Sequence, residues 1–174
     1  CTIQKTFQLL ESVKKQMMKQ SSALLLKQSN LLLIVFLRFN NMTRINSDLD
    51  PKRLKRMHLV AELREITMVP AALRRSIQAR KADDIQKNIP KDFTLNKGHV
   101  TFFYDKLKFL IKRFNKLADE MERRGYNPDR TRVKAFDGFD KEWYGDWKSS
   151  DKDDEIVLER INFRISQKPH LYED

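Results

Sequence analysis

A stripe of apolar residues in the second half of the chain constrains its fold most. Successive members are separated by 4, 3, 4, 3 and 4 residues, which places them on one face of an α-helix. These residues are Phe103, Leu107, Leu110, Phe114, Leu117 and Met121. Gly125, directly after Arg123 and Arg124, predicts the C-terminal end of this helix. A helix with so wide an apolar face must pack against other elements of a core.

Other helices are predicted from their boundary residues. Asp50 and Pro51 are a favourable N-cap and first position for one helix. Pro70 predicts the start of a short helix that runs through Ile77, and Ser150 or Asp151 predicts the cap of a last helix that ends before Pro169. Segments 82–98 and 126–149 are predicted as loops, and no run of residues alternates convincingly as a strand would.

The composition agrees with a helical domain. Only 4 Gly and 5 Pro occur among 174 residues, and 40% of the residues are apolar, which is enough for a core and argues against wholesale disorder. We therefore predict an all-α fold, namely a compact single domain of three or four helices with an irregular loop region. This domain is expected to span residues 42–174, with residues 1–41 as an N-terminal extension.

The first 41 residues differ from the rest of the chain. They contain six basic residues, one acidic residue and an apolar run from Leu31 to Leu37. Seven apolar residues are too few to cross a bilayer, which takes about 20. One interpretation is a helix that targets the protein or lies on a membrane surface. We favour the other interpretation, an extension that is non-native, removed or disordered.

The charge of the chain indicates a polyanionic partner. With 35 Lys and Arg against 24 Asp and Glu, the formal net charge is +11, so nucleic acid is the leading candidate. A basic helical protein without such a partner remains the alternative at this point. Cys1 is the single cysteine, which excludes an internal disulfide framework and a cysteine-based zinc site. The three histidines lie far apart and no phosphate-binding glycine loop occurs, so we expect no metal and no cofactor.

Four blocks of sequence resemble a known enzyme family. They occur in family order over residues 42–174. The blocks are Met42-Thr43-Arg44-Ile45-Asn46, His58 to Glu65 (HLVAELRE), Gly98 to Leu107 (GHVTFFYDKL), and Arg160 to Arg164 (RINFR) with Gln167-Lys168-Pro169. This pattern is similar to the pyrimidine-dimer DNA glycosylases of the phage endonuclease V type.

The resemblance implies a bifunctional mechanism. These enzymes cut the glycosidic bond of the 5′ pyrimidine of a dimer in ultraviolet-damaged DNA, and then break the strand at the abasic site by β-elimination. The implied nucleophile is the N-terminal amine of Thr43, exposed by translation from Met42 or by processing. An α-amine has a pKa of about 7.7–8.0, so it is far more available as a free base than a lysine amine. The implied catalytic carboxylate is Glu65, which would stabilise the cationic sugar and remove the 2′ proton.

The resemblance also implies a set of DNA-binding residues. They are Arg44, His58, Arg64, Arg160 and Arg164. Two positions depart from the phage pattern: Met57 replaces a glutamine and Met68 replaces an arginine. The C-terminal aromatic tail is shortened to Leu171-Tyr172-Glu173-Asp174. We therefore expect cleavage of abasic sites to be retained better than selectivity for dimers.

The remaining expectations concern partners and location. The expected partner is double-stranded DNA that carries ultraviolet lesions or abasic sites. The protein is expected to be a monomer and not to bind a membrane. The expected location is the cytoplasm or nucleoid, or a nuclear or viral-host DNA compartment. The alternative function is that of a non-catalytic basic DNA-binding protein of the same fold. A membrane-surface protein that uses Leu31–Leu37 and the upstream lysines is a third possibility.

Overall fold

The computed structural model describes residues 45–95 and 97–172, all of which belong to one compact unit. Within these residues the chain forms six α-helices and no strand, so the all-α prediction is confirmed. The helices are α2 (Arg56–Glu65), α3 (Met68–Ala79), α4 (Ala82–Lys87), α5 (His99–Phe102), α6 (Leu107–Arg123) and α7 (Asp151–Gln167). The 3₁₀ turns are η1 (Pro51–Arg53), η2 (Arg130–Phe136), η3 (Lys141–Trp143) and η4 (Pro169–Leu171). The helix number exceeds three or four because α4 and α5 are short helices that the apolar pattern does not reveal.

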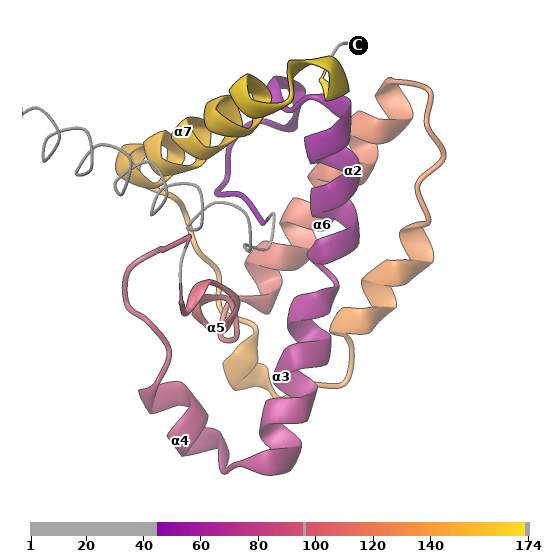
Figure 1. Ribbon diagram of the computed structural model, residues 1–174. Helices are drawn as coiled ribbons and strands as arrows, with labels where there is room; N and C mark the ends of the chain where they lie inside the picture. The colour runs from indigo at the N-terminus through magenta and orange to yellow at the C-terminus, as the bar shows by residue number, and fades with distance from the viewer. Residues whose placement is uncertain (1–44, 96, 173–174) are drawn as a thin grey trace, which may run out of the picture. The chain divides into compact units, whose positions relative to one another are not determined.

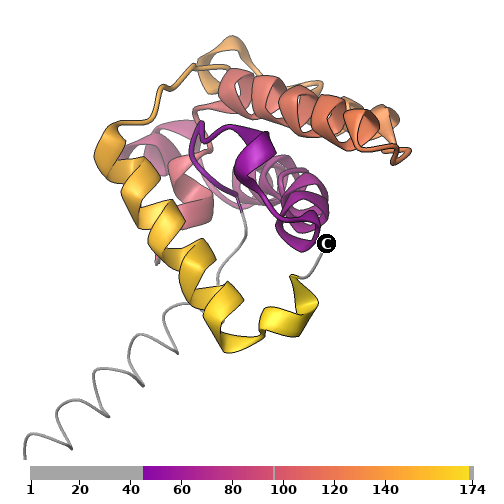
Figure 2. The same ribbon diagram turned by 90° about the horizontal axis from the view of Figure 1, so that it is seen from above.

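The helices pack around the column formed by α2 and α3, which follow one another almost end to end (Figure 1). Helix α6 packs against α2, while α3 contacts α5 and η2. Helix α7 crosses near the beginning of α2, and η4 brings the chain back towards α2 in both views (Figures 1 and 2). The predicted extension 1–41 lies outside the described residues, so its division from the domain stays a prediction.

The long apolar stripe is divided between two helices. Phe103 lies in a break between α5 and α6, and the stripe from Leu107 to Met121 is the buried face of α6. At this break the Lys106 amine bonds the Phe102 carbonyl at 2.9 Å and the Asp105 carboxylate at 2.6 Å. Gly145 lies so close to the Asp105 carbonyl that a Cβ atom would come within 2.2 Å of it. The single helix predicted from the spacing is therefore interrupted by a tertiary contact.

The C-terminal end of α6 is where the sequence places it. Gly125 has a φ of +82°, in the left-handed region where glycine is favoured. The amide of Gly125 bonds the Glu122 carbonyl at 2.8 Å, and the amide of Tyr126 bonds the Met121 carbonyl at 2.9 Å. These two bonds make a Schellman motif, which satisfies carbonyls that the helix leaves open.

The helix predicted at Asp50 begins later than expected. The Asp50 side chain accepts from the Lys52 amide at 3.0 Å, but it caps η1, and α2 starts only at Arg56. Leu54 between them is extended and buried. The Arg124 side chain donates to the carbonyls of Pro51 and Lys52. Burial of Leu54 and this bonding by a distant arginine explain why the first turn does not continue into α2.

The last helix begins as predicted. The Ser150 hydroxyl accepts from the Asp153 amide, and the Asp153 carboxylate accepts from the Ser150 amide at 2.8 Å. This reciprocal pair is a capping box, which satisfies amides at the start of α7. Helix α3 begins at Met68, two residues before the predicted Pro70, because a proline is tolerated anywhere in a first turn that has no intrahelical amide partners.

Candidate functional site

A concave site lies where α2 ends and α3 begins. It has a volume of about 390 Å³ and is hereafter called the Glu65 cavity. Its lining residues are Met57, Val60, Ala61, Arg64, Glu65, Met68 and Arg132. Glu65 is the last residue of α2 and is half-buried, whereas Arg64 is exposed. The cavity therefore combines one carboxylate with two guanidinium groups.

Arg132 fixes the end of α2 from a distant part of the chain. Its side chain donates to the Arg64 carbonyl at 3.2 Å and to the Thr67 hydroxyl at 3.0 Å. The Thr67 hydroxyl itself donates to the Arg64 carbonyl at 3.0 Å. The last carbonyls of a helix lack intrahelical partners, and a cation near them is favourable. These bonds therefore hold the backbone that carries Arg64 and Glu65 in one position.

A second polar arrangement on α2 is buried. Glu62 and Arg113 are both inaccessible to solvent and form a two-pronged ion pair. The Arg113 Nε and Nη2 atoms each donate to a Glu62 oxygen at 2.9 Å. Asn46 adds two more bonds to this carboxylate, one from its backbone amide at 2.9 Å and one from its side chain at 2.5 Å. All four donors therefore converge on one carboxylate.

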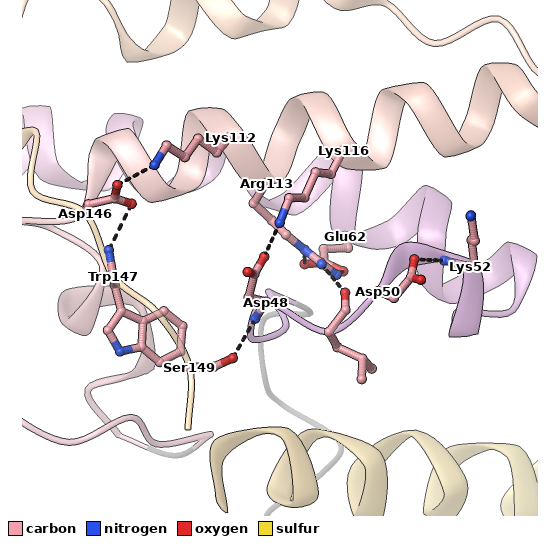
Figure 3. Close-up of polar contacts among 11 residues, drawn as sticks. Asp48, Asp50, Lys52, Glu62, Lys112, Arg113, Lys116, Asp146, Trp147 and Ser149 are labelled. Carbon is pink, nitrogen blue, oxygen red and sulfur yellow. Dashed lines mark hydrogen bonds and ion pairs between the residues drawn. The ribbon is translucent and has the colours of Figure 1, made fainter. Parts of the chain in front are cut away.

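This network anchors the segment 45–49 to three helices. Arg113 of α6 also donates to the Leu49 carbonyl, and Arg160 of α7 donates to the Asn46 side-chain oxygen. Lys116 pairs with Asp48 at 2.6 Å, and the Asp48 amide bonds the Ser149 hydroxyl at 3.3 Å (Figure 3). Because donors and acceptors come from α2, α6, α7 and the 149 loop, the path of the chain just after residue 44 is closely defined.

A buried histidine lies beside the same network. His99 Nδ1 is 2.7 Å from the Thr94 carbonyl, so this nitrogen carries the proton and donates it. Burial, helped by the positive charge of Arg160, lowers the pKa of His99 from 6.5 to about 4. Its ring packs edge-on against Phe93 and Phe103. His99 is therefore a neutral core residue at pH 7.

The structure brings together only part of the predicted site. Thr43 and Arg44 lie outside the described residues. Arg64 and Glu65 share the Glu65 cavity, whereas His58, Arg160 and Arg164 do not line it. His58 is buried and stacks on the Tyr172 ring with centroids 4.6 Å apart.

The two predicted arginines of α7 differ from ordinary surface cations. Arg160 is almost fully buried, and Arg164 is half-buried with its Nε atom covered. In this conformation Arg160 binds Asn46 of the anchored segment. Direct contact of these residues with DNA stays a prediction.

Sequence reasoning missed three residues of the arrangement: Asn46, Arg113 and Arg132. One signal was available for Arg113, because it lies three residues after Leu110 and four before Leu117, on the apolar face of α6. A charge in such a face requires a buried partner. Nothing in the sequence names that partner, since Glu62 is 51 residues away.

Within the described part of the chain, no group of three or more His, Cys, Asp or Glu residues is placed to hold a metal ion. None of the helices described is both long enough and apolar enough to cross a bilayer.

Comparison with protein families gives a match to most of the described helices. The family described as pyrimidine dimer DNA glycosylase matches residues 42–133, which is more than half of the chain. The match includes η1, α2, α3, α4, α5 and α6, and every residue that lines the Glu65 cavity. It therefore includes both arrangements around α2, the cavity and the buried ion pair. The chain belongs to the pyrimidine dimer DNA glycosylase family, and it is a DNA-repair enzyme that acts on a DNA substrate.

Proposed function

We propose that this protein removes pyrimidine dimers from ultraviolet-damaged DNA and then cleaves the abasic site through an imine with the N-terminal amine of Thr43. The observation that carries the proposal is the arrangement around α2. Glu65 lines a cationic cavity at the end of this helix, and Glu62 of the same helix binds Asn46, three residues after Thr43. One short helix thus holds the proposed carboxylate and anchors the segment that follows the proposed nucleophile.

The chemistry needs an amine that is free base near neutral pH. The α-amine of Thr43 attacks the sugar C1′, the damaged pyrimidine leaves, and an imine forms after the sugar ring opens. Glu65 then removes the 2′ proton, and the 3′ phosphate leaves by β-elimination. Such an amine exists only if residues 1–42 are absent, because the nitrogen of an internal Thr43 is an amide.

Anchoring of residues 45–49 supports the positioning that this mechanism requires. A nucleophile is effective only when its approach to the reacting carbon is restricted. The bonds from Glu62, Arg113 and Arg160 restrict the chain close to Thr43. Arg64 and Arg132 provide positive charge beside Glu65 for the phosphates that flank the reacting sugar. Arg44 is proposed to add to this charge.

The rim of the Glu65 cavity bears on the choice of lesion. Met57 and Met68 line it and are 49% and 56% exposed, which is unusual for large apolar side chains. Neither can bond a phosphate or a base edge. We therefore propose that abasic sites, which need no base recognition, are cleaved more efficiently than dimers are excised. The enzyme is proposed to act as a monomer, wherever the DNA of its cell or viral host lies.

Borohydride trapping tests the proposed mechanism. A chain that begins at Thr43 is compared with the full 174 residues on duplexes that carry an abasic site or a thymine dimer. Borohydride reduces the imine to a stable amine, so we expect a covalent adduct with the shorter chain and none with the full chain. Thr43→Ala in the shorter chain is the matched control, because it keeps the α-amine and should still form the adduct.

Two results would contradict the mechanism. An adduct of equal yield from the full chain would show that another amine is the nucleophile. Absence of an adduct from either chain, with DNA binding retained, would favour the alternative of a non-catalytic DNA-binding protein.

A further inference from the structure

A second concave region lies at the opposite end of α2. It has a volume of about 610 Å³ and is hereafter called the basic cavity. Its lining residues are Lys52, Arg53, Leu54, Lys55, Arg56, Arg124 and Tyr126. Five of these seven residues are cationic and none is acidic. The sequence resemblance assigned no role to any of them.

The break between η1 and α2 creates this concentration of charge. Because Leu54 turns into the core, the basic residues on either side of it project from the junction, and Lys52, Arg53 and Arg56 are exposed. Arg124 closes one side of the cavity from the end of α6, where it binds the Lys52 carbonyl. The Arg56 guanidinium lies 5.4 Å from the centre of the Tyr126 ring.

Most of the exposed cations that line the basic cavity are not paired with carboxylates in the described part of the chain. Arg124 is neutralised by Glu120 at 2.6 Å, but no carboxylate among the described residues pairs with Lys52, Arg53 or Arg56. The cavity between Asp48 and Asp146 is different, because its Lys112 and Lys116 are both paired with carboxylates (Figure 3). In addition, no side chain caps the start of α2, where helix amides carry partial positive charge.

Both cavities are lined by residues of α2. Arg56 lines the basic cavity and its neighbour Met57 lines the Glu65 cavity. With a rise of about 1.5 Å per residue, Arg56 and Glu65 are separated by about 14 Å along the helix. Base pairs of B-DNA are spaced at about 3.4 Å. A duplex that runs along α2 with its damaged nucleotide at Glu65 would therefore reach the basic cavity about four base pairs away.

We propose that the basic cavity binds the phosphodiester backbone of the same DNA duplex, about four base pairs from the damaged nucleotide. This inference rests on the proposed function for the position of the lesion. Duplex DNA is the occupant that the structure favours, because phosphates repeat along it and one rigid ligand can extend from the Glu65 cavity to the basic cavity. The contacts are to phosphates, so they raise affinity for every sequence and read none.

The test removes three charges from the basic cavity. In the chain that begins at Thr43, Lys52→Gln, Arg53→Gln and Arg56→Gln are combined. The matched control is Lys81→Gln, Lys87→Gln and Lys91→Gln, which removes three exposed charges at and beyond α4. Fluorescence anisotropy measures the affinity for an undamaged 20-base-pair duplex between 50 and 200 mM salt. Thermal unfolding verifies that each variant is folded, and the Lys52→Gln, Arg53→Gln double variant replaces the triple one if it is not.

Three lost phosphate contacts have a measurable signature. The slope of log K against log salt concentration should become shallower by about 2.7, and affinity in 100 mM salt should fall by about tenfold or more. The control should change the slope by less than about 1. Equal changes in both triple variants, or none in the first, would overturn the proposal.

Duplex length separates this proposal from the proposed function. Two duplexes are compared, each with ten base pairs on one side of an abasic site and three on the other. In the first duplex the ten base pairs lie 5′ of the abasic site, and in the second they lie 3′ of it. The unmutated chain should bind one of them more tightly, and the triple variant should lose that preference while it still forms the trapped adduct on saturating DNA. If the triple variant retains the preference, the proposal that the basic cavity binds DNA is wrong. If the unmutated chain forms no adduct, the mechanism fails, but the salt slopes still decide whether the basic cavity binds DNA.

Discussion

Helix α2 carries two glutamates three residues apart that have opposite surroundings. Glu62 is inaccessible and its carboxylate accepts four bonds, from Arg113 and Asn46. Glu65 is half-buried and lines an open cationic cavity. Three residues of helix rotate a side chain by about 60° from its starting direction, which is enough at the edge of a packed face to exchange the core for the surface. Residue type and helix position alone therefore do not determine whether a glutamate is buried in an ion pair or lines an open cavity.

The largest expected effect is on the rate of β-elimination, with little change in the stability of the fold. Glu65→Gln in the chain that begins at Thr43 should slow β-elimination about 10²- to 10⁴-fold, because it removes the proposed base. The free energy of unfolding should change much less than in Glu62→Gln, because Glu65 is not part of the buried ion pair. Strand cleavage and urea unfolding measure the two quantities. Normal cleavage by the variant would show that Glu65 is a surface acid without a catalytic role.

Glu62→Gln should lower the stability of the fold rather than act directly on the chemistry. It removes the charge that compensates Arg113 in the core, and loss of one partner of a buried pair costs about 3–5 kcal/mol. Urea unfolding measures this cost. The double variant Glu62→Met, Arg113→Met is the sharper comparison, because it removes both buried charges and should recover part of the lost stability. A single variant as stable as the unmutated chain would mean that the ion pair contributes little.

A smaller effect on the free energy of unfolding comes from the pH, through the buried residue His99. The pKa of His99 is about 4 in the folded chain and 6.5 when unfolded, so the unfolded chain binds more protons between these values. Stability should therefore fall by about 2–3 kcal/mol as the pH is lowered from 7 to 4.5. Urea unfolding at several pH values measures this loss.

The matched variants for the pH experiment are two histidine substitutions. His99→Gln should flatten the pH dependence in this window, whereas His170→Gln changes an exposed histidine and should leave it unaltered. If both variants retain the full slope, acids elsewhere in the chain are responsible for it.

Local sequence was sufficient wherever a structural element depends on its own residues. The Ser150 cap, the Gly125 stop and the apolar face of α6 are all specified within a few positions, and all were predicted correctly. The break at Phe103 was not predicted, since it depends on the approach of Gly145, about 40 residues later. The start of α2 was missed for the same reason, because Arg124 binds the carbonyls of η1.

The candidate site divides in the same way. The sequence by itself determined the all-α class, the basic charge and the family, because apolar period, composition and contiguous motifs are local properties. Only the tertiary structure decided that Glu65 shares a cavity with Arg132, that Glu62 is bound by Arg113, and that Arg160 is buried beside Asn46. Each of these pairs spans about 50 residues or more, and hydrogen bonds and ion pairs form between groups that are close in space, whatever their separation along the chain.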